Sequence, residues 1–460
     1  SLNDFFLGGR SVGPWMGAFA YGTTYFSASV FIGFAGKQGW GFGPSALLIG
    51  VGNALVGALA AWAILAKRTR RMTQNLDTMT MPEFLEARYQ SEHIKMISAV
   101  IIFIFLLPYS ASIFKGLGHL FESTFHISFD FALIILVVIT GIYLVLGGYF
   151  AVTVTSFIQG IIMLVGAVIM ICVLVYKAGG LTEAITTVNI NYPEHVPVAQ
   201  QPSWLTIASL IFMTSVGSWG LPQMVQKFYA IKNEKVIPKA AIITTIFALV
   251  IGITAYGSGI LSHVFFDNNT VPKMANGGVN YDQIMPNLLA IKLPEALLAI
   301  IMLLILSASM SSLASLVLVS ASSIAVDLYK GYLKKDVNEK TSLIIMRSFS
   351  VLFIFATYLI SKLQLGFIVT MQSLSWGVLS GAFLAPYVFA IYSKKVTKAA
   401  AYAGIYSGAG TAIILTMALG AANSALAASI AIIVPFIVVP IVSAFTPKVD
   451  ANVIEKAFKK

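Results

Sequence analysis

Long apolar runs separated by short polar loops dominate this chain. A helix needs roughly 20 mostly apolar residues to cross the hydrocarbon core of a bilayer, and twelve segments meet that requirement. The pattern predicts an all-α, polytopic membrane protein. The expected spans are 12–36, 44–66, 95–121, 128–147, 150–176, 203–230, 237–263, 293–328, 341–361, 366–392, 398–420 and 424–445.

Lys and Arg residues gather in alternate loops. They follow the second, sixth, eighth and tenth expected spans and occupy the C-terminal tail, whereas residues 178–203 contain neither. Cytoplasmic loops of membrane proteins carry an excess of Lys and Arg. Both ends of the chain are therefore predicted to lie in the cytoplasm, and the protein to be a multi-pass protein of the plasma (inner) membrane.

The composition excludes several other classes of protein. Of the 460 residues, 58% are hydrophobic and only 10% are charged, whereas soluble domains carry about 25% charged residues. The net charge of +11 lies in short loops, where it favours contact with anionic lipid over a nucleic acid partner. One Cys excludes a disulfide framework. With no nucleophile–base constellation or phosphate loop, we expect no enzyme.

Two expected spans contain helix-weakening segments at matching places. The first holds the polar run Tyr21–Ser29, and the sixth holds Thr214–Gln223 with its Gly and Pro residues. Main-chain groups freed within a membrane must find partners, so broken helices occur where they line a cavity. The two spans lie five apart, as in transporters built from inverted repeats. The alternative is that small residues merely allow close helix packing.

This organisation predicts a transporter core over residues 1–392 and a smaller C-terminal part. The inverted repeats are expected at about 12–176 and 203–392. Residues 393–460 are expected to form two additional transmembrane helices and a cytoplasmic tail.

Eight short segments stand out by their order and spacing. They are Asp4–Ser11, Phe31–Gly36, Thr80–Phe84, Leu120–Phe125, Gly147–Val152, Ile158–Gly160, Ala308–Leu313 and Ser322–Tyr329. With them the chain resembles the sodium:solute symporter family over about residues 4–400, most closely its proline and pantothenate branches. The resemblance implies a five-plus-five inverted-repeat core of the amino acid/sodium symporter type with two C-terminal extra helices. Family members usually carry one more helix before Asp4, and this sequence begins just after its place.

The resemblance also implies a sodium ion as the coupling ion. In the family, a cation site joins the break in the first span to the middle of the eighth. Matched residue by residue, the carbonyls of Thr23, Phe26 and Ala308 and the hydroxyls of Ser311 and Ser312 would hold the ion. Ser311 and Ser312 share a helix face with Ala308. The alternative for the many Ser residues of this span is bonding to their own helix carbonyls.

Two departures from the family pattern bear on the coupling. Some members have an acidic residue where this chain has Tyr25. Members often have an Asp, linked in some relatives to a second sodium, where this chain has Ser156. One sodium per cycle is therefore expected. Proton-coupled or uncoupled transport stays an alternative.

The solute is expected beside the two breaks, with the third, eighth and tenth spans around it. Tyr109 and Ser218 match positions that shape the proline site in the proline branch, where the sixth-span break reads Gly-Gln-Pro-His. Here it reads Gly220-Leu-Pro-Gln223, closer to the pantothenate branch, and the small Ser218 predicts a roomier pocket. Helix packing alone is the alternative for each polar candidate. The candidates are Ser27, Ser29, Tyr109, Thr214, Ser218, Trp219, Gln223, Gln372 and Lys115.

Two basic residues inside expected spans need separate treatment. A charge within a membrane span is a functional hypothesis by default, and Lys115 would attract a substrate carboxylate. It would alternatively extend along its own apolar stem to the outer interface. For Lys227, at the inner end of the sixth span, a lipid or helix-end role is expected.

The expected function is thus sodium-coupled symport of a small organic solute by alternating access. The solute is expected to bear a carboxylate, as in an amino acid such as proline or a pantothenate-like molecule; a sugar or sialic acid is the alternative. A membrane-embedded sensor and a channel are the competing classes. The expected partners are the solute, sodium and the lipid bilayer. The sequence leaves the oligomeric state open, and a monomer is one of the options.

Overall fold

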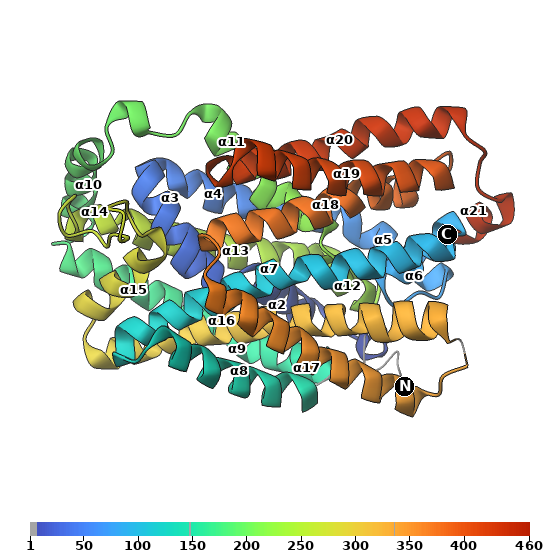
Figure 1. The fold of residues 1–460 in the computed structure, drawn as a ribbon, viewed down its shortest axis with the longest axis horizontal. Coiled ribbons are helices and arrows are strands. Elements are labelled where there is room, and N and C mark those ends of the chain that lie inside the picture. The colour runs from blue at the N-terminus through green and yellow to red at the C-terminus, as the bar shows by residue number, and fades with distance from the viewer. Residues whose placement is uncertain (1–6, 147–148, 335) are drawn as a thin grey trace.

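The structure is a computed structural model that describes residues 7–146, 149–334 and 336–460. Within these ranges the chain is helical, and β-structure is limited to two isolated bridges. The helices form an elongated bundle in which the first described residues and the C-terminus lie at the same end (Figure 1). The fold is therefore all-α, as the apolar pattern predicts.

The helices differ widely in length. The α-helices are α2 (Pro14–Tyr25), α3 (Ala35–Phe42), α4 (Leu47–Gly52), α5 (Lys67–Asn75), α6 (Met81–Tyr89), α7 (Glu92–Phe125), α8 (Phe129–Leu146), α9 (Tyr149–Lys177), α10 (Leu181–His195), α11 (Trp204–Ser215), α12 (Pro222–Ala230), α13 (Ile237–Ile260), α14 (Ser262–Phe265), α15 (Tyr281–Lys292), α16 (Glu295–Ser322), α17 (Glu339–Leu363), α18 (Ile368–Tyr392), α19 (Lys398–Leu419), α20 (Ser424–Phe445) and α21 (Ala451–Ala457).

Short helical segments of other pitch connect several of these helices. The 3-10 segments are η1 (Gly8–Arg10), η3 (Gly43–Ala46), η6 (Val198–Gln200), η7 (Val216–Gly220), η8 (Glu234–Val236) and η10 (Ala421–Asn423). The π-helical segments are η2 (Ser29–Phe34), η4 (Asn53–Ala60), η5 (Trp62–Ala66) and η9 (Ser323–Leu333).

Helices cover all twelve expected spans in the described part of the chain, but fewer separate elements qualify as membrane-spanning. Nine are long and apolar enough, or ten when the bent pair Val198–Gly220 and Pro222–Ala230 counts as one span. The difference has two causes. The outer half of the broken first span runs on into the second as Ser29–Asn75, and the fourth span is the shorter apolar helix Phe129–Val145.

The core of the bundle surrounds the first half-helix, α2. Helix α2 packs against α9, α12, α13 and α16, and α7 lies against both α16 and α18. The helices α19 and α20 pack on each other and on α18; that they are additions to the transporter core stays a prediction. The division into repeats at 12–176 and 203–392 stays a prediction.

Apolar side chains also cover much of the outside of the bundle. On α8, α9 and α17, residues such as Val138, Ile142, Val165 and Phe355 are about half exposed or more. A soluble protein rarely exposes so large an apolar surface. These faces are suited to lipid, and the polar loops lie at the two ends of the bundle (Figure 1).

Glycines allow two helices of the core to touch along their backbones. A Cβ atom on Gly259 of α13 would lie 1.9 Å from the carbonyl oxygen of Ala35, and one on Gly39 would lie 2.2 Å from the carbonyl carbon of Gly259. Small residues let membrane helices approach closely enough for such packing.

We expect Gly259→Ala to lower the melting temperature of the purified protein, because backbone cannot give way to the added methyl group. Overpacking of this kind typically costs about 1–3 kcal/mol. The matched control is Gly410→Ala in α19, where nothing lies within 4 Å of an added Cβ. Equal melting temperatures for the two variants in the same detergent would contradict the close approach.

Candidate functional site

Both predicted breaks are present. The first helix, α2, ends at Tyr25, and Phe26 is extended, with φ −113° and ψ 131°. The sixth span bends by 50° between η7 and α12, where Pro222 cannot donate an amide hydrogen and Gly220 precedes the extended Leu221. The two breaks meet, because the Tyr25 hydroxyl donates to the carbonyl oxygen of Thr214 over 2.6 Å.

The main-chain oxygens freed by the first break converge on one side chain of α16. The Ser312 Oγ lies 3.0 Å from the carbonyl oxygen of Thr23, 3.3 Å from that of Thr24 and 3.2 Å from that of Phe26. A hydroxyl has one hydrogen to donate. The surplus of oxygen lone pairs at this point is the environment that a hard cation prefers.

The neighbouring serine extends this oxygen cluster. The Ser311 hydroxyl donates to Thr23 Oγ1 over 2.7 Å and lies 2.9 Å from the hydroxyl of Ser156. Ala308 is fully buried one turn earlier on the same face of α16. We call Thr23, Phe26, Ala308, Ser311 and Ser312 the cage. The structure brings four of these predicted residues into contact and places Ala308 beside them.

The two predicted serines differ from other serines of α16. Ser309, Ser322 and Ser323 donate to carbonyls of their own helix, which was the alternative for all of them. Ser311 and Ser312 reach across to α2 instead. The neutral Ser156 completes the cluster at the position where many family members have an Asp.

Three contacts around the cage were not predicted. The amide of Ala28 donates to Ser309 Oγ over 3.0 Å, and Thr24 Oγ1 lies 3.1 Å from Ser315 Oγ. The Lys227 ammonium donates to that same Ser315 hydroxyl over 3.0 Å. The lipid role expected for Lys227 is therefore wrong, since its side chain is buried inside the bundle.

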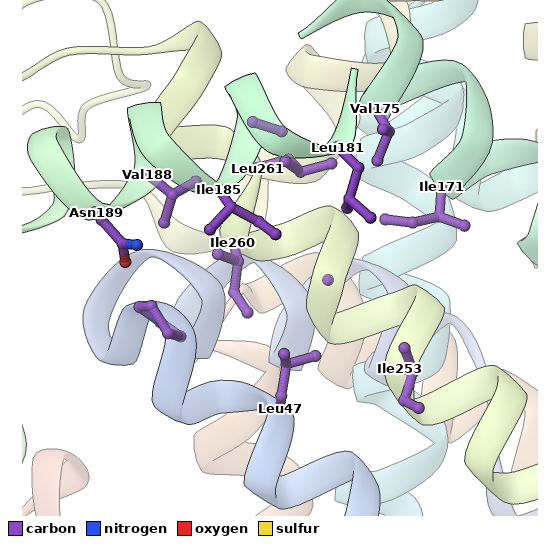
Figure 2. Close-up of a pocket in the computed structure, with 13 residues that line it drawn as sticks. Leu47, Ile171, Val175, Leu181, Ile185, Val188, Asn189, Ile253, Ile260 and Leu261 are labelled. Carbon is purple, nitrogen blue, oxygen red and sulfur yellow. The ribbon is translucent and has the colours of Figure 1, made fainter. Parts of the chain in front are cut away.

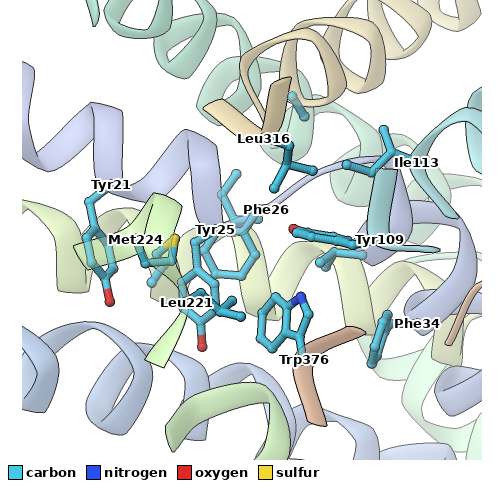
Figure 3. Packing of buried hydrophobic residues seen from close by; sticks show 14 of the residues in the cluster. Tyr21, Tyr25, Phe26, Phe34, Tyr109, Ile113, Leu221, Met224, Leu316 and Trp376 are labelled. Atoms are coloured by element: carbon cyan, nitrogen blue, oxygen red, sulfur yellow. The ribbon is translucent and has the colours of Figure 1, made fainter. Parts of the chain in front are cut away.

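Aromatic rings surround a small cavity between the two breaks. The ring of Trp376 lies 6.3 Å from that of Tyr25 and 5.6 Å from that of Tyr109 (Figure 3). The cavity has a volume of about 10 Å³, enough for about one water molecule. The structure is thus closed at this point. Its lining residues are Tyr25, Phe26, Val30, Phe34, Asn53, Thr214, Gln372 and Trp376.

Three of the nine predicted solute residues lie at this cavity. Thr214 and Gln372 line it, and Tyr109 packs on its Trp376 wall. Ser27 and Ser29 are buried in the first break, where the Ser29 hydroxyl lies 3.0 Å from that of Ser112. Trp376 and Asn53 also line the cavity but were not predicted, although an Asn within the apolar second span was a usable signal.

The predicted solute residues Ser218, Trp219 and Gln223 of the sixth span do not line the cavity. Ser218 donates to the carbonyl oxygen of Ser215, and Trp219 Nε1 donates to the carbonyl oxygen of Val56. Gln223 is buried at the start of α12. Within the described residues, Gln223 Oε1, Gln372 Oε1 and Trp376 Nε1 are buried without a hydrogen-bond partner, whereas nearly all buried polar atoms have one.

Lys115 was expected either to attract a substrate carboxylate or to extend to the outer interface, and the structure shows a third arrangement. Its ammonium lies 2.9 Å from Asp282 Oδ2 of α15 and donates to the carbonyl oxygen of Gly366 over 2.5 Å. Asp282 also accepts from the amide of Ile368 over 3.2 Å. Both charged side chains are buried. The pair compensates the Lys115 charge and ties α7, α15 and α18 together, so the residue neither reaches the lipid interface nor waits for a substrate carboxylate.

A larger cavity lies away from both breaks. It has a volume of about 400 Å³ and lies between α4, α9, α10 and α13. Leu181, Ile185 and Val188 of α10 form one of its walls (Figure 2). Asn189 is its sole polar side chain among the lining residues, so little in it would orient a polar solute.

The sodium:solute symporter family matches residues 5–408 of the chain. The chain belongs to this family. Sodium/proline symporter 2 of Staphylococcus saprophyticus is 29% identical over 425 residues, which are 90% of this chain and 80% of the relative. A sodium/proline symporter of Staphylococcus aureus is 30% identical over 420 residues, covering 89% of this chain and 80% of the relative.

Solved structures share the fold. A sodium-coupled sialic acid symporter in a substrate-bound, outward-open state has a TM-score of 0.79 at 18% identity, covering 97% of this chain and 93% of that one. A nucleobase-cation-symport-1 family transporter in a closed conformation has a TM-score of 0.55 at 13% identity, covering 98% and 97%.

The family membership confirms the coarse prediction. This member is a multi-pass membrane protein, its fold is that of sodium-coupled symporters, and sodium is its coupling ion. The family and its named relatives transport solutes.

We expect Lys115→Met to destabilise the symporter strongly, because it leaves Asp282 as a buried charge without its partner. Breaking a buried ion pair typically costs about 3–5 kcal/mol. The double variant Lys115→Met/Asp282→Asn should regain much of the lost melting temperature. Lys362→Met is the control, since Lys362 forms an exposed pair with Asp130 at 3.7 Å. A control as unstable as Lys115→Met would contradict this account.

Proposed function

We propose that this symporter couples one sodium ion to the uptake of a small carboxylate-bearing solute, of amino-acid size such as proline, across the plasma membrane by alternating access. The observation that carries the proposal is the convergence of the Thr23 and Phe26 carbonyls with the hydroxyls of Ser311 and Ser312. These oxygens join the first break to α16 in the middle of the bundle.

The cage is the proposed sodium site. A sodium ion there would accept lone pairs from the carbonyls of Thr23, Phe26 and Ala308 and from the two serine hydroxyls. Because Ser156 adds a hydroxyl and not a carboxylate, the cluster supplies no charge for a second ion. One sodium per cycle therefore suits the residues better than two.

The aromatic cavity is the proposed solute site. Gln372 Oε1 and Trp376 Nε1 are buried with no hydrogen-bond partner in the part of the chain that the structure describes, so they offer one acceptor and one donor there. The rings of Tyr25, Tyr109 and Trp376 suit an apolar ring or chain. The helix α12 begins beside the second break at Pro222, and helix N-termini attract carboxylates. Two relatives named sodium/proline symporter support an amino acid over a sugar.

The break links the two sites. Phe26 contributes its carbonyl to the cage and its ring to the lining of the solute cavity. Sodium binding would fix the first break against α16 and so shape the cavity for the solute. This coupling is a free energy shared by the two sites, typically about 1–3 kcal/mol, and the solute must raise the affinity for sodium by the same factor.

We expect a solute of this class to raise the melting temperature in sodium but not in potassium, and Ser312→Ala to abolish the difference. A ligand at a hundred times its Kd stabilises the folded state by about 2.7 kcal/mol. The measurement is a thermal scan of the purified protein with a panel including proline, pantothenate, a sugar and sialic acid. Ser348→Ala is the control, because Ser348 bonds only to its own helix among the contacts described. Equal stabilisation in both salts would argue for proton-coupled or uncoupled transport.

We expect Gln372→Leu to weaken solute binding while leaving sodium binding without solute unchanged. One hydrogen bond contributes about 0.5–1.5 kcal/mol, so the solute Kd should rise roughly threefold to tenfold. Titration calorimetry with the stabilising solute, at saturating sodium, measures the change. The exposed Gln200→Leu of the η6 loop serves as the control. An unaltered solute Kd would place the solute elsewhere.

A further inference from the structure

A second small, partly polar cavity lies at the cytoplasmic end of α16. Its volume is about 10 Å³. Thr80, at the start of α6, forms its polar wall together with Gln226 of α12, Ser322 at the end of α16, and Ser323 and Asp327 of η9. It shares no residue with the cage or with the aromatic cavity.

Asp327 is the decisive group in this cavity. Its side chain is 1% exposed, and its Oδ1 accepts a hydrogen bond from the Thr80 hydroxyl over 2.6 Å. Its Oδ2 is buried with no hydrogen-bond partner among residues whose placement is described. A buried carboxylate is costly unless a cation or several donors balance it.

The positive charge of Lys95 acts on Asp327, but its ammonium is held by another partner. Lys95 pairs with Glu86 over 2.6 Å, and Glu83 caps α6 by accepting from the amide of Met79 over 2.8 Å. Glu83 and Glu86 add negative charge around Asp327. The surroundings therefore favour a positive ion at this cavity.

The other lining groups suit such an ion. The hydroxyls of Ser322 and Ser323 donate to Val319 and Ser320 of their own helix, which leaves their oxygen lone pairs available. With the Asp327 carboxylate and the Thr80 hydroxyl, they make a set of hard oxygen ligands. The cavity has room for about one water molecule, the scale of a single dehydrated monovalent cation.

The cavity also lies in line with the cage. Ser323 follows Ser312 by three helical turns of α16, so both share one face at a separation of about 16 Å. Ser315 and Val319 lie between them on this face. Lys330 of η9, Lys334 in the loop after it and Lys340 at the start of α17 lie at this end, which marks it as cytoplasmic.

We propose that Asp327, Thr80 and Ser323 form an inner cation site, weaker than the cage, which holds the sodium ion after it leaves the cage for the cytoplasm. This proposal rests on the proposed function of the cage. The number of ions per cycle stays one, because the inner site receives the same ion. The Asp327 carboxylate draws the ion along α16.

Equilibrium binding of radioactive sodium to the purified full chain tests the proposal. We expect Ser312→Ala to lose the tighter component and to retain one at least tenfold weaker. Asp327→Asn should lose the weaker component alone, and the double variant should bind no sodium. Asp267→Asn, in an exposed loop, should behave as the unmodified protein. If Asp327→Asn does not elute as a single folded species, Thr80→Val replaces it and should weaken the same component about tenfold.

Three results would overturn the inner site while leaving the cage intact. In the first, neither Asp327→Asn nor Thr80→Val changes any component of sodium binding. In the second, Ser312→Ala by itself removes all sodium binding. In the third, Asp327→Asn would alter only the pH dependence of stability, which would make the carboxyl a proton carrier. An unmodified protein that binds no sodium would instead refute the cage and, with it, the proposed function.

Discussion

The break in the first span frees carbonyl oxygens that cannot form hydrogen bonds with bulk water inside the membrane. The rest of the structure depends on how these oxygens find partners. The Ser312 hydroxyl of α16 lies within hydrogen-bond distance of three of them and has one hydrogen to share among them. The requirement that main-chain groups be satisfied in a membrane thus produces a meeting of two helices and a cluster of oxygens. A helix without Phe26 in an extended conformation would need no such partner.

Charges at both ends of the bundle hold the elements around this core. At the outer end, the buried pair of Lys115 and Asp282 joins α7 to α15 and α18. At the inner end, Arg10 donates to the carbonyl oxygens of Tyr229 and Thr78 and to both oxygens of Thr73. Burial lowers the pKa of Arg10 to about 10, so its guanidinium stays charged at neutral pH.

In the proposed alternating-access cycle, the closed aromatic cavity and the inner contacts would belong to one conformation. Arg70 donates to the carbonyl oxygens of Ile231 and Lys232, and Arg88 donates to those of Ala390 and Ser393. These contacts join α5 to the loop after α12 and α6 to the end of α18. An inward-open state would have to separate some of them, because the solute and its ion leave on this side.

The sequence by itself determined the helical class, the approximate spans and the two breaks, while Ser311 and Ser312 were named through the family resemblance. Apolar run length and the positions of Gly and Pro are local properties that the bilayer constrains strongly. Tertiary structure alone decided that Lys115 meets Asp282, that Lys227 turns inward to Ser315, and that Trp376 lines the proposed solute cavity. These partners lie far apart in the chain, and helix rotation and packing, which no local pattern encodes, determine whether they meet.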